Sequence, residues 1–313
     1  MIKKKIATIG GGSGHYTLLS ALKDTGHMIY AIVSMADNGG STGVLRDEYG
    51  VLPPGDVRQC LVALSSAEAE LRELFAYRYS DGPFKGHSFG NIFLSTLEKS
   101  TGSFPEAVKR AGKILQVRGR VLPASLSSST HLLIKLKDGN ELLGESHLDK
   151  NPLIRNVGVK EVCLSSKVSA NPEAVKALID ADTIILAPGD IWASIMPVIL
   201  LQEIQDAINK SKAKLIFISN ITNKKGISDG FTVCDYVEIL SGYIREPDLI
   251  IANNAPIPER LEQDYREQEG EGVIVSTCGR LKDKTLSENI LSSRGGLLRH
   301  DSEKLSKVLL ENI

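Results

Sequence analysis

The feature that most constrains this chain is the glycine-rich turn Gly10-Gly11-Gly12-Ser13-Gly14, which follows a short apolar strand predicted over residues 5–9. A helix is predicted over 16–23, directly after the turn. Main-chain N–H groups approach a phosphate closely only where side chains are absent, and the helix then points its positive end at the anion. The alternative is a tight turn without a ligand, but four glycines are more than such a turn needs. We therefore predict that a phosphate-bearing nucleotide binds here, with Gly11, Gly12, Ser13 and Gly14 as contacts.

The glycine spacing differs from two familiar nucleotide motifs. His15 stands where the third glycine of G-x-G-x-x-G would follow Gly10 and Gly12. The Lys-Ser/Thr pair of a Walker A loop is missing from the sequence after the turn. A nicotinamide-dependent oxidoreductase stays an alternative, but the spacing argues against it.

Strand-like and helix-like segments alternate along most of the chain, which is typical of a doubly wound sheet. We predict an α/β fold over 1–313 as a single domain, built on a Rossmann-like, mostly parallel sheet of six or seven strands. Strands are expected at 5–9, 28–35, 159–164, 183–186, 214–219, 249–252 and 272–276. Helices of the alternating part are expected at 16–23, 172–179, 191–209, 231–241, 258–267 and 303–311.

Two segments depart from the alternation. A helical insertion is predicted over about 56–114, with helices at 56–79, 88–98 and 105–114. A β-hairpin excursion is predicted over about 131–147, because Asp138-Gly139 supplies a turn between two strand-like runs.

Composition excludes several classes of protein. The formal net charge of −1 gives no general attraction to nucleic acid or to an anionic membrane. The four cysteines are far apart and form no C-x-x-C pair, so we expect free thiols rather than a zinc site or a disulfide framework. The longest apolar run, 191–204, is predicted to be a buried helix, and no membrane span is expected. We expect a cytoplasmic protein that forms a homo-oligomer.

Ligands of open parallel sheets bind beyond the carboxyl ends of the strands, and polar residues follow several of the predicted strands. After the second strand, Asp37 stands where an acidic residue meets a ribose or a metal, and Arg46 can hold a phosphate with two hydrogen bonds. Asn38, Gly40 and Ser41 complete this candidate loop. The alternative is a long polar turn.

Three further segments belong to the candidate site. Gly55, Asp56 and Arg58 open a helix, where Asp56 can equally be a simple N-cap and Arg58 opposes the helix dipole unless an anion lies nearby. His87, Ser88 and Asn91 precede or open another helix, where His87 can equally be a core or capping residue. Gly189 and Asn220 follow two later strands, although Asp190 beside Gly189 repels a phosphate.

The strings IGGGSG, MADNGGSTGVLRDEYGVLPPGDVRQCLVAL, GHSFGNIFL and APGDIWASIMP closely resemble the CofD-like family. Within it they look most like the YvcK branch of gluconeogenesis or morphogenesis factors. The likeness is strongest over 10–94, recurs over 182–222 and returns at Arg299-His300-Asp301. It covers most of the chain.

The resemblance implies a Rossmann-like sheet and a pocket for UDP-sugars such as UDP-N-acetylglucosamine, with Arg299 among the contacts. It implies a cytoplasmic regulator of carbon metabolism, cell-wall synthesis and cell shape. The other branch of the family consists of 2-phospho-L-lactate transferases of deazaflavin cofactor biosynthesis, which use a magnesium ion held by aspartates beyond the second strand. For this chain that alternative would assign catalysis to Asp37 and Asp56 and a metal contact to Asp37.

The sequence departs from the family pattern at three positions. Asp37-Asn38 replaces Asp-Asp, Ala187-Pro188-Gly189-Asp190 replaces Gly-Pro-Gly-Ser, and the loop after Asn220 lacks the usual Thr-Gln-Pro-Gly-Glu-Thr. One carboxylate is left where two would hold a metal, and no base–nucleophile pair stands out. We therefore favour ligand binding without turnover and without a required cofactor, with a Mg²⁺-dependent phospho-group transferase as the alternative.

Overall fold

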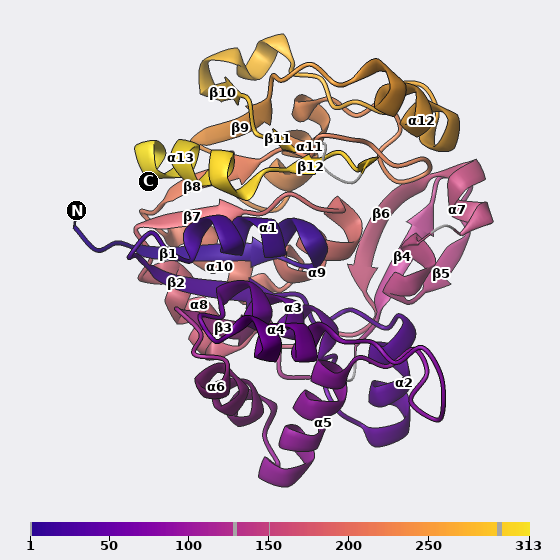
Figure 1. Ribbon diagram of the computed structural model, residues 1–313. Helices are drawn as coiled ribbons and strands as arrows, with labels where there is room; N and C mark the ends of the chain where they lie inside the picture. The colour runs from indigo at the N-terminus through magenta and orange to yellow at the C-terminus, as the bar shows by residue number, and fades with distance from the viewer. Residues whose placement is uncertain (1, 128–129, 150, 293–295) are drawn as a thin grey trace.

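A parallel seven-stranded sheet runs through the molecule, in the strand order β10-β9-β8-β7-β1-β2-β3 (Figure 1). The computed structural model describes residues 2–127, 130–149, 151–292 and 296–313. The strands of this sheet are β1 (Lys5–Gly10), β2 (Met28–Val33), β3 (Arg120–Pro123), β7 (Thr183–Leu186), β8 (Lys214–Ile218), β9 (Leu249–Asn253) and β10 (Thr285–Glu288). The predicted α/β, Rossmann-like and parallel architecture is confirmed.

Strand β1 lies at the point where the strand order reverses. Ile6 of β1 is paired with Ile29 of β2 on one side and with Thr183 of β7 on the other. The chain first builds outward through β2 and β3, then returns to β7 and builds outward in the opposite direction. Open sheets bind ligands at such a switch point, and here it falls between the turns that follow β1 and β7.

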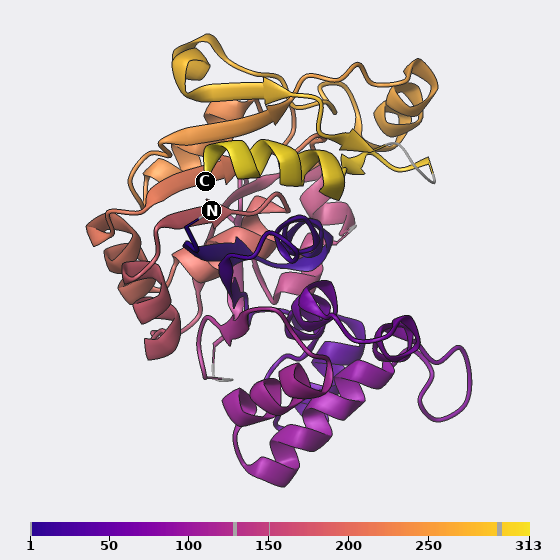
Figure 2. The same ribbon diagram turned by 60° about the vertical axis from the view of Figure 1, so that its left-hand side comes forward.

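Helices cover both faces of the sheet (Figures 1 and 2). On one face, α1 (Gly12–Leu22) packs against α3 (Gly55–Leu64) and α13 (Ser302–Asn312). On the other, α8 (Pro172–Ile179) packs against α10 (Gln202–Lys210). Two apolar cores result, because successive side chains of a strand point to opposite faces: Ile185 belongs to the first core, and Ile184 belongs to the second.

The predicted helical insertion contains several helices. They are α3, α4 (Ala69–Ala76), α5 (Phe89–Thr101) and α6 (Phe104–Ile114). Ser88 and Ser103 begin α5 and α6 because each side chain accepts a main-chain N–H of the first turn. The single helix predicted over 56–79 is wrong: α3 and α4 are separate, and Ser65 between them pairs with Val117.

The hairpin of β4 (Leu132–Leu136) and β5 (Glu141–Leu143) is confirmed, and the 3₁₀ helix η1 (Glu145–Leu148) follows it. Strand β6 (Val159–Leu164) was expected in the main sheet, but it pairs antiparallel with β4 in a separate three-stranded sheet. Its exposed Lys160 and intermediate Glu161 fit this position better than a strand buried on both faces.

Other predicted boundaries also need correction. The helix predicted over 191–209 is a π-helix η2 (Ile191–Ile195) continued by α9 (Met196–Ile199), and then α10. Residues 272–276 form isolated bridges to Thr222 and Thr232 rather than a strand of the sheet. The sequence reasoning missed strands β3 and β10.

The remaining helices and strands are α2 (Gly40–Tyr49), α7 (Pro152–Val157), α11 (Val233–Ser241), α12 (Glu259–Glu269), η3 (Gly279–Lys284), β11 (Leu291–Ser292) and β12 (Arg299–His300).

Within the described part of the chain, no single helix has the length and apolar composition to cross a membrane. The consecutive helices Ile191–Ile199 and Gln202–Lys210 reach that length and composition only as a pair, and the pair is bent by 79°.

The prediction of free thiols is wrong for two of the four cysteines. Cys234 and Cys278 form a disulfide with a Cα–Cα distance of 5.9 Å, although they lie 44 residues apart in the sequence. Cys234 lies in α11, and Cys278 precedes η3, so only the tertiary fold brings the two thiols together. Cys60 and Cys163 are free, as predicted.

Candidate functional site

The two turns at the switch point touch each other. Gly12 has φ = +61°, a left-handed conformation that favours glycine. A Cβ atom on Gly14 would lie 1.9 Å from the carbonyl oxygen of Pro188, so only glycine allows the start of α1 to approach the turn after β7. The predicted glycine-rich turn is thus built into the switch point.

Two cavities adjoin these turns. The first has a volume of about 230 Å³ and the second about 670 Å³. Both are lined by Ser13, Gly14, Gly189, Asp190 and Lys224, so the two cavities share a wall. The first extends toward Asn220, Tyr236 and His300, whereas the second extends toward Gly11, Gly12, Gly40 and Glu145.

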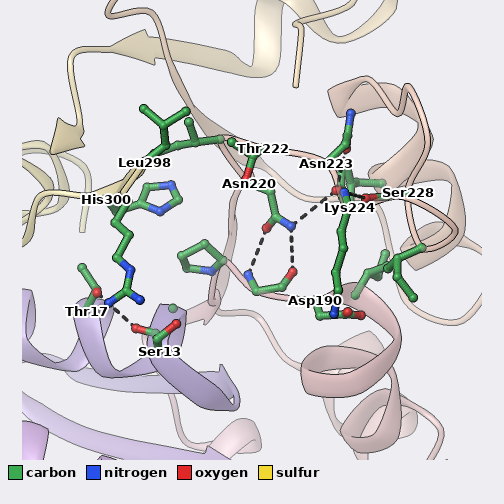
Figure 3. Close-up of a pocket in the computed structure, with 18 residues that line it drawn as sticks. Ser13, Thr17, Asp190, Asn220, Thr222, Asn223, Lys224, Ser228, Leu298 and His300 are labelled. Atoms are coloured by element: carbon green, nitrogen blue, oxygen red, sulfur yellow. Dashed lines mark hydrogen bonds between the residues drawn. The ribbon is translucent and has the colours of Figure 1, made fainter. Parts of the chain in front are cut away.

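Asn220 holds the turn after β7 in place. Its Oδ1 accepts a hydrogen bond from the N–H of Gly189 (2.9 Å), and its Nδ2 donates to the Gly189 carbonyl (2.8 Å) (Figure 3). Both polar atoms of the amide are thereby engaged with the protein main chain. Asn220 lines the first cavity, and it also shapes that cavity by fixing Gly189.

A carboxyl group lies at the N-terminus of α1. Asp56 Oδ1 accepts a hydrogen bond from the N–H of Gly12 (3.0 Å). Burial, together with the neighbouring Asp37 carboxylate, raises the pKa of Asp56 to about 7. An anion bound at the glycine turn therefore meets a group that carries a full negative charge only above neutral pH.

Further carboxyl groups surround the larger cavity. Burial raises the pKa of Glu145 to about 8, and Asp37, Asp56 and Asp190 contribute to the rise. Burial also raises the pKa of Asp37, although the N–H of Gly39 donates to its Oδ1 (2.9 Å) and opposes the shift. These shifts show that the carboxyl groups are buried beside one another, and that the nearby Arg58 and Lys224 only partly offset the effect.

Asn38 has a structural contact. Its Oδ1 accepts a hydrogen bond from the N–H of Ser146 (2.8 Å), which ties the loop after β2 to η1. Where the family pattern has a second aspartate, this chain therefore has an amide that anchors the hairpin excursion.

A hydrogen-bonded network joins the remaining predicted residues of the helical insertion. Arg58 Nε donates to Asn91 Oδ1 (2.9 Å), Asn91 Nδ2 donates to the Ser41 hydroxyl (3.1 Å), and that hydroxyl bonds His87 Nδ1 (3.1 Å). Arg58 also acts electrostatically on Asp37 and Asp56, so the network borders the carboxyl groups.

Three predicted contacts lie differently from the sequence expectation. Ser88 has no exposed surface, and its hydroxyl caps α5. Gly55 is buried, and a Cβ there would lie 2.5 Å from Asp37 Oδ2. Arg46 is 9% exposed, and its Nε donates to Asp47 Oδ1 (3.0 Å). None of the three lines the two cavities described above, and neither do seven other predicted contacts: Asp37, Asn38, Ser41, Asp56, Arg58, His87 and Asn91. The contact of all these residues with a ligand stays a prediction.

The described residues contain no group of three or more His, Cys, Asp or Glu side chains placed to hold a metal ion together. Oxygen ligands of the kind that Mg²⁺ prefers are present in Asp37, Asp56 and Glu145. In this arrangement they do not converge on one metal position, and we derive no chemical step from a metal.

Several lining residues were not identified as ligand contacts from the sequence, among them Glu145, Lys224 and His300. Glu145 comes from the hairpin excursion, and Lys224 comes from the loop after β8. His300 lies beside the predicted Arg299 in the first cavity, and its Nε2 is 3.0 Å from the carbonyl oxygen of Ser219. Burial lowers the pKa of His300 to about 4, so its ring is neutral at pH 7. The position of His300 next to the predicted Arg299 could have identified it from the sequence. No sequence pattern marked Glu145 or Lys224 as a ligand contact.

The sequence and the structure are similar to known proteins over nearly the whole chain. Residues 6–291 match the family model described as 2-phospho-L-lactate transferase CofD. The gluconeogenesis factor of Halalkalibacterium halodurans is 36% identical, over 99% of this chain and 97% of that protein. The gluconeogenesis factor of Bacillus subtilis is 34% identical, over 99% and 98%. A crystal structure of a UPF0052 family member from Bacillus halodurans superposes with a TM-score of 0.91 at 35% identity, covering 99% of this chain and 100% of that one.

Proposed function

Because this chain belongs to the CofD family, and within it to the gluconeogenesis factors, we propose that it binds a nucleotide sugar across the carboxyl ends of β1 and β7. UDP-N-acetylglucosamine is the ligand we propose to test first. The observation that carries the proposal is the pair of adjoining cavities that share the glycine turn as a wall. An elongated ligand with a central diphosphate fits such a pair, with its base and its sugar on either side.

The glycine turn supports the central position of the diphosphate. Ser13 and Gly14 line both cavities and lie in the first turn of α1, where main-chain N–H groups lack acceptors within the helix. Such N–H groups, together with the helix dipole, favour an anion. The volumes of about 230 and about 670 Å³ suit the parts of a nucleotide sugar.

We propose a regulatory rather than a catalytic role. The ligand would report the supply of activated sugar, and the protein would adjust carbon metabolism, cell-wall synthesis and cell shape in response. Two polar side chains of the site support binding: the ring of His300 bonds a main-chain carbonyl, and the Asn220 amide is engaged by Gly189. Neither is placed as the base of a base–nucleophile pair.

A specific observation supports a second candidate, a Mg²⁺-dependent transferase of a phosphate-linked group. Asp37 lies close enough to Asp56 to disfavour the ionised form of Asp56, and a bound cation would relieve that repulsion. Phosphoryl-group chemistry needs little from the protein beyond positioning and charge neutralisation. This candidate agrees with the description of the matching family.

A thermal-shift titration with UDP-N-acetylglucosamine separates the two candidates. The regulatory proposal predicts that the ligand raises the melting temperature without Mg²⁺ and is recovered intact by mass spectrometry. No shift at millimolar ligand would overturn it. The transferase candidate predicts Mg²⁺-dependent consumption of an activated phospho-donor, lost in Asp37→Asn, and unchanged turnover in that variant would remove Asp37 from the mechanism.

A further inference from the structure

Lys224 stands at the junction of the two cavities. It belongs to the loop after β8, and it lines both cavities. Figure 3 shows its side chain extending from this loop toward Asp190. Its Nζ donates to the carbonyl oxygen of Leu148 (2.8 Å) and lies 3.5 Å from Asp149 Oδ1. These contacts connect the loop to the end of η1.

Lys224 is the exception among the charged side chains that line the larger cavity, because the others are carboxyl groups. Glu145, Asp149 and Asp190 line it with carboxyl groups, and Lys224 is the one Lys or Arg among the described residues of its lining. The ammonium group acts electrostatically on Asp190 and Glu145 and favours their ionised forms. An anionic ligand that enters this cavity without a metal ion therefore meets one side-chain cation in its lining, whereas Arg299 lines the first cavity.

The contacts that Lys224 makes are easily exchanged. A neutral carbonyl and a mostly exposed carboxylate hold the ammonium group, and exposed ion pairs of this kind contribute about 0–1 kcal/mol. A phosphate oxygen can displace these partners, because it carries a negative charge that the Leu148 carbonyl lacks and it can approach the ammonium group more closely than the 3.5 Å of Asp149 Oδ1. The flexible four-carbon side chain allows the exchange without a change in the main chain.

We propose that Lys224 selects ligands that carry a diphosphate, by pairing with the phosphate placed at Ser13 and Gly14. The assignment rests on the proposed function, because it names a phosphate contact within that site. It also gives a role to the loop after Asn220, which departs from the family pattern at this position. The nearest alternative is a purely structural bridge from Lys224 to Leu148.

The test is a calorimetric titration of wild type, Lys224→Met, Lys224→Arg and Lys225→Met with UDP and with uridine, in buffer without Mg²⁺. Lys225 is a matched control: it is the next residue, its side chain is exposed, and it lines neither cavity. We expect Lys224→Met to weaken UDP binding about tenfold or more and to leave uridine binding unchanged. Lys224→Arg should recover most of the loss, and Lys225→Met should match wild type.

Potassium chloride gives a second readout that a structural bridge would not change. The affinity of wild type for UDP should fall with salt more steeply than that of Lys224→Met. An equal loss of UDP and uridine affinity would overturn the assignment in favour of the structural bridge, as would unchanged UDP binding in Lys224→Met. If wild type binds neither compound, the proposed nucleotide site itself fails, and this assignment fails with it.

Discussion

The side-chain amide of Asn220 and the main chain of Gly189 form a reciprocal pair of hydrogen bonds, with lengths of 2.9 and 2.8 Å. The pair joins the loop after β8 to the turn after β7, and Gly14 of α1 packs against the same turn. Three consecutive strands of the sheet, β1, β7 and β8, therefore present one connected surface at their carboxyl ends. The candidate site is built on that connection.

Replacing Asn220 with alanine should lower the free energy of unfolding by about 1–3 kcal/mol, because two main-chain groups of Gly189 lose their partners. Urea denaturation of wild type and Asn220→Ala measures the difference. Asn140→Ala is the control, since the exposed Asn140 bonds only within its own hairpin turn. Equal losses of unfolding free energy in the two variants would show that the Asn220–Gly189 hydrogen bonds add no more stability than an exposed turn contact.

Gly14→Ala should be destabilising by more than about 2 kcal/mol, because the new Cβ would lie 1.9 Å from the Pro188 carbonyl oxygen. Gly112→Ala is the matched control: it lies in α6, and its nearest neighbour would be an ordinary contact at 3.7 Å. Alanine should stabilise that helix by up to about 1 kcal/mol. Differential scanning calorimetry tests the pair, and a Gly14→Ala variant as stable as wild type would mean that α1 can move away from β7.

The stability gained from Glu145→Gln should depend on pH. The raised pKa of Glu145, about 8, means that its carboxyl is largely neutral below that pH and that the fold favours the protonated form. Stability is therefore lost as pH rises from the ordinary value of 4.5 through about 8. We expect Glu145→Gln to be near neutral at pH 5 and stabilising by about 1–3 kcal/mol at pH 8.5.

Urea titrations at the two pH values measure this difference. Glu141→Gln, which removes an exposed carboxyl from the same hairpin, is the matched control. A Glu145→Gln effect that is the same at pH 5 and pH 8.5 would contradict the assigned protonation.

Reduction of the Cys234–Cys278 disulfide should lower stability. In the chain-entropy account, closing a loop with a sequence separation of 44 residues is worth up to about 4 kcal/mol. Oxidised protein should therefore melt at a higher temperature than protein treated with dithiothreitol or the Cys278→Ser variant. Cys163→Ser, which removes a free thiol, should melt like wild type. Equal melting temperatures with and without the reductant would show that the disulfide contributes nothing.

The parts of the fold that could be predicted are those set by local pattern. The strand before Gly10 follows from its short apolar run, and the turn follows from its glycines. The structure has the strand and the helix after the turn as β1 and α1. The buried run 183–186 was likewise sufficient to identify β7.

What could not be predicted depends on tertiary contacts. Strand β6 looks like a member of the main sheet, but its pairing with β4 is decided by the hairpin excursion. The disulfide joins two segments that are 44 residues apart, and the spacing of the cysteines in the sequence does not predict that they meet. Glu145 and Lys224 are ordinary charged residues in the sequence, and they become candidate contacts because η1 and the loop after β8 meet over the cavity.

The central claim is that a nucleotide sugar binds with its diphosphate at the start of α1. The most direct measurement is a crystal structure of the protein soaked with UDP-N-acetylglucosamine in the absence of Mg²⁺. We expect the diphosphate within hydrogen-bonding distance of the main-chain N–H groups of Ser13 and Gly14, with the two ends of the ligand in the two cavities. A ligand bound elsewhere, or no bound ligand at a concentration that saturates the protein in solution, would contradict the account.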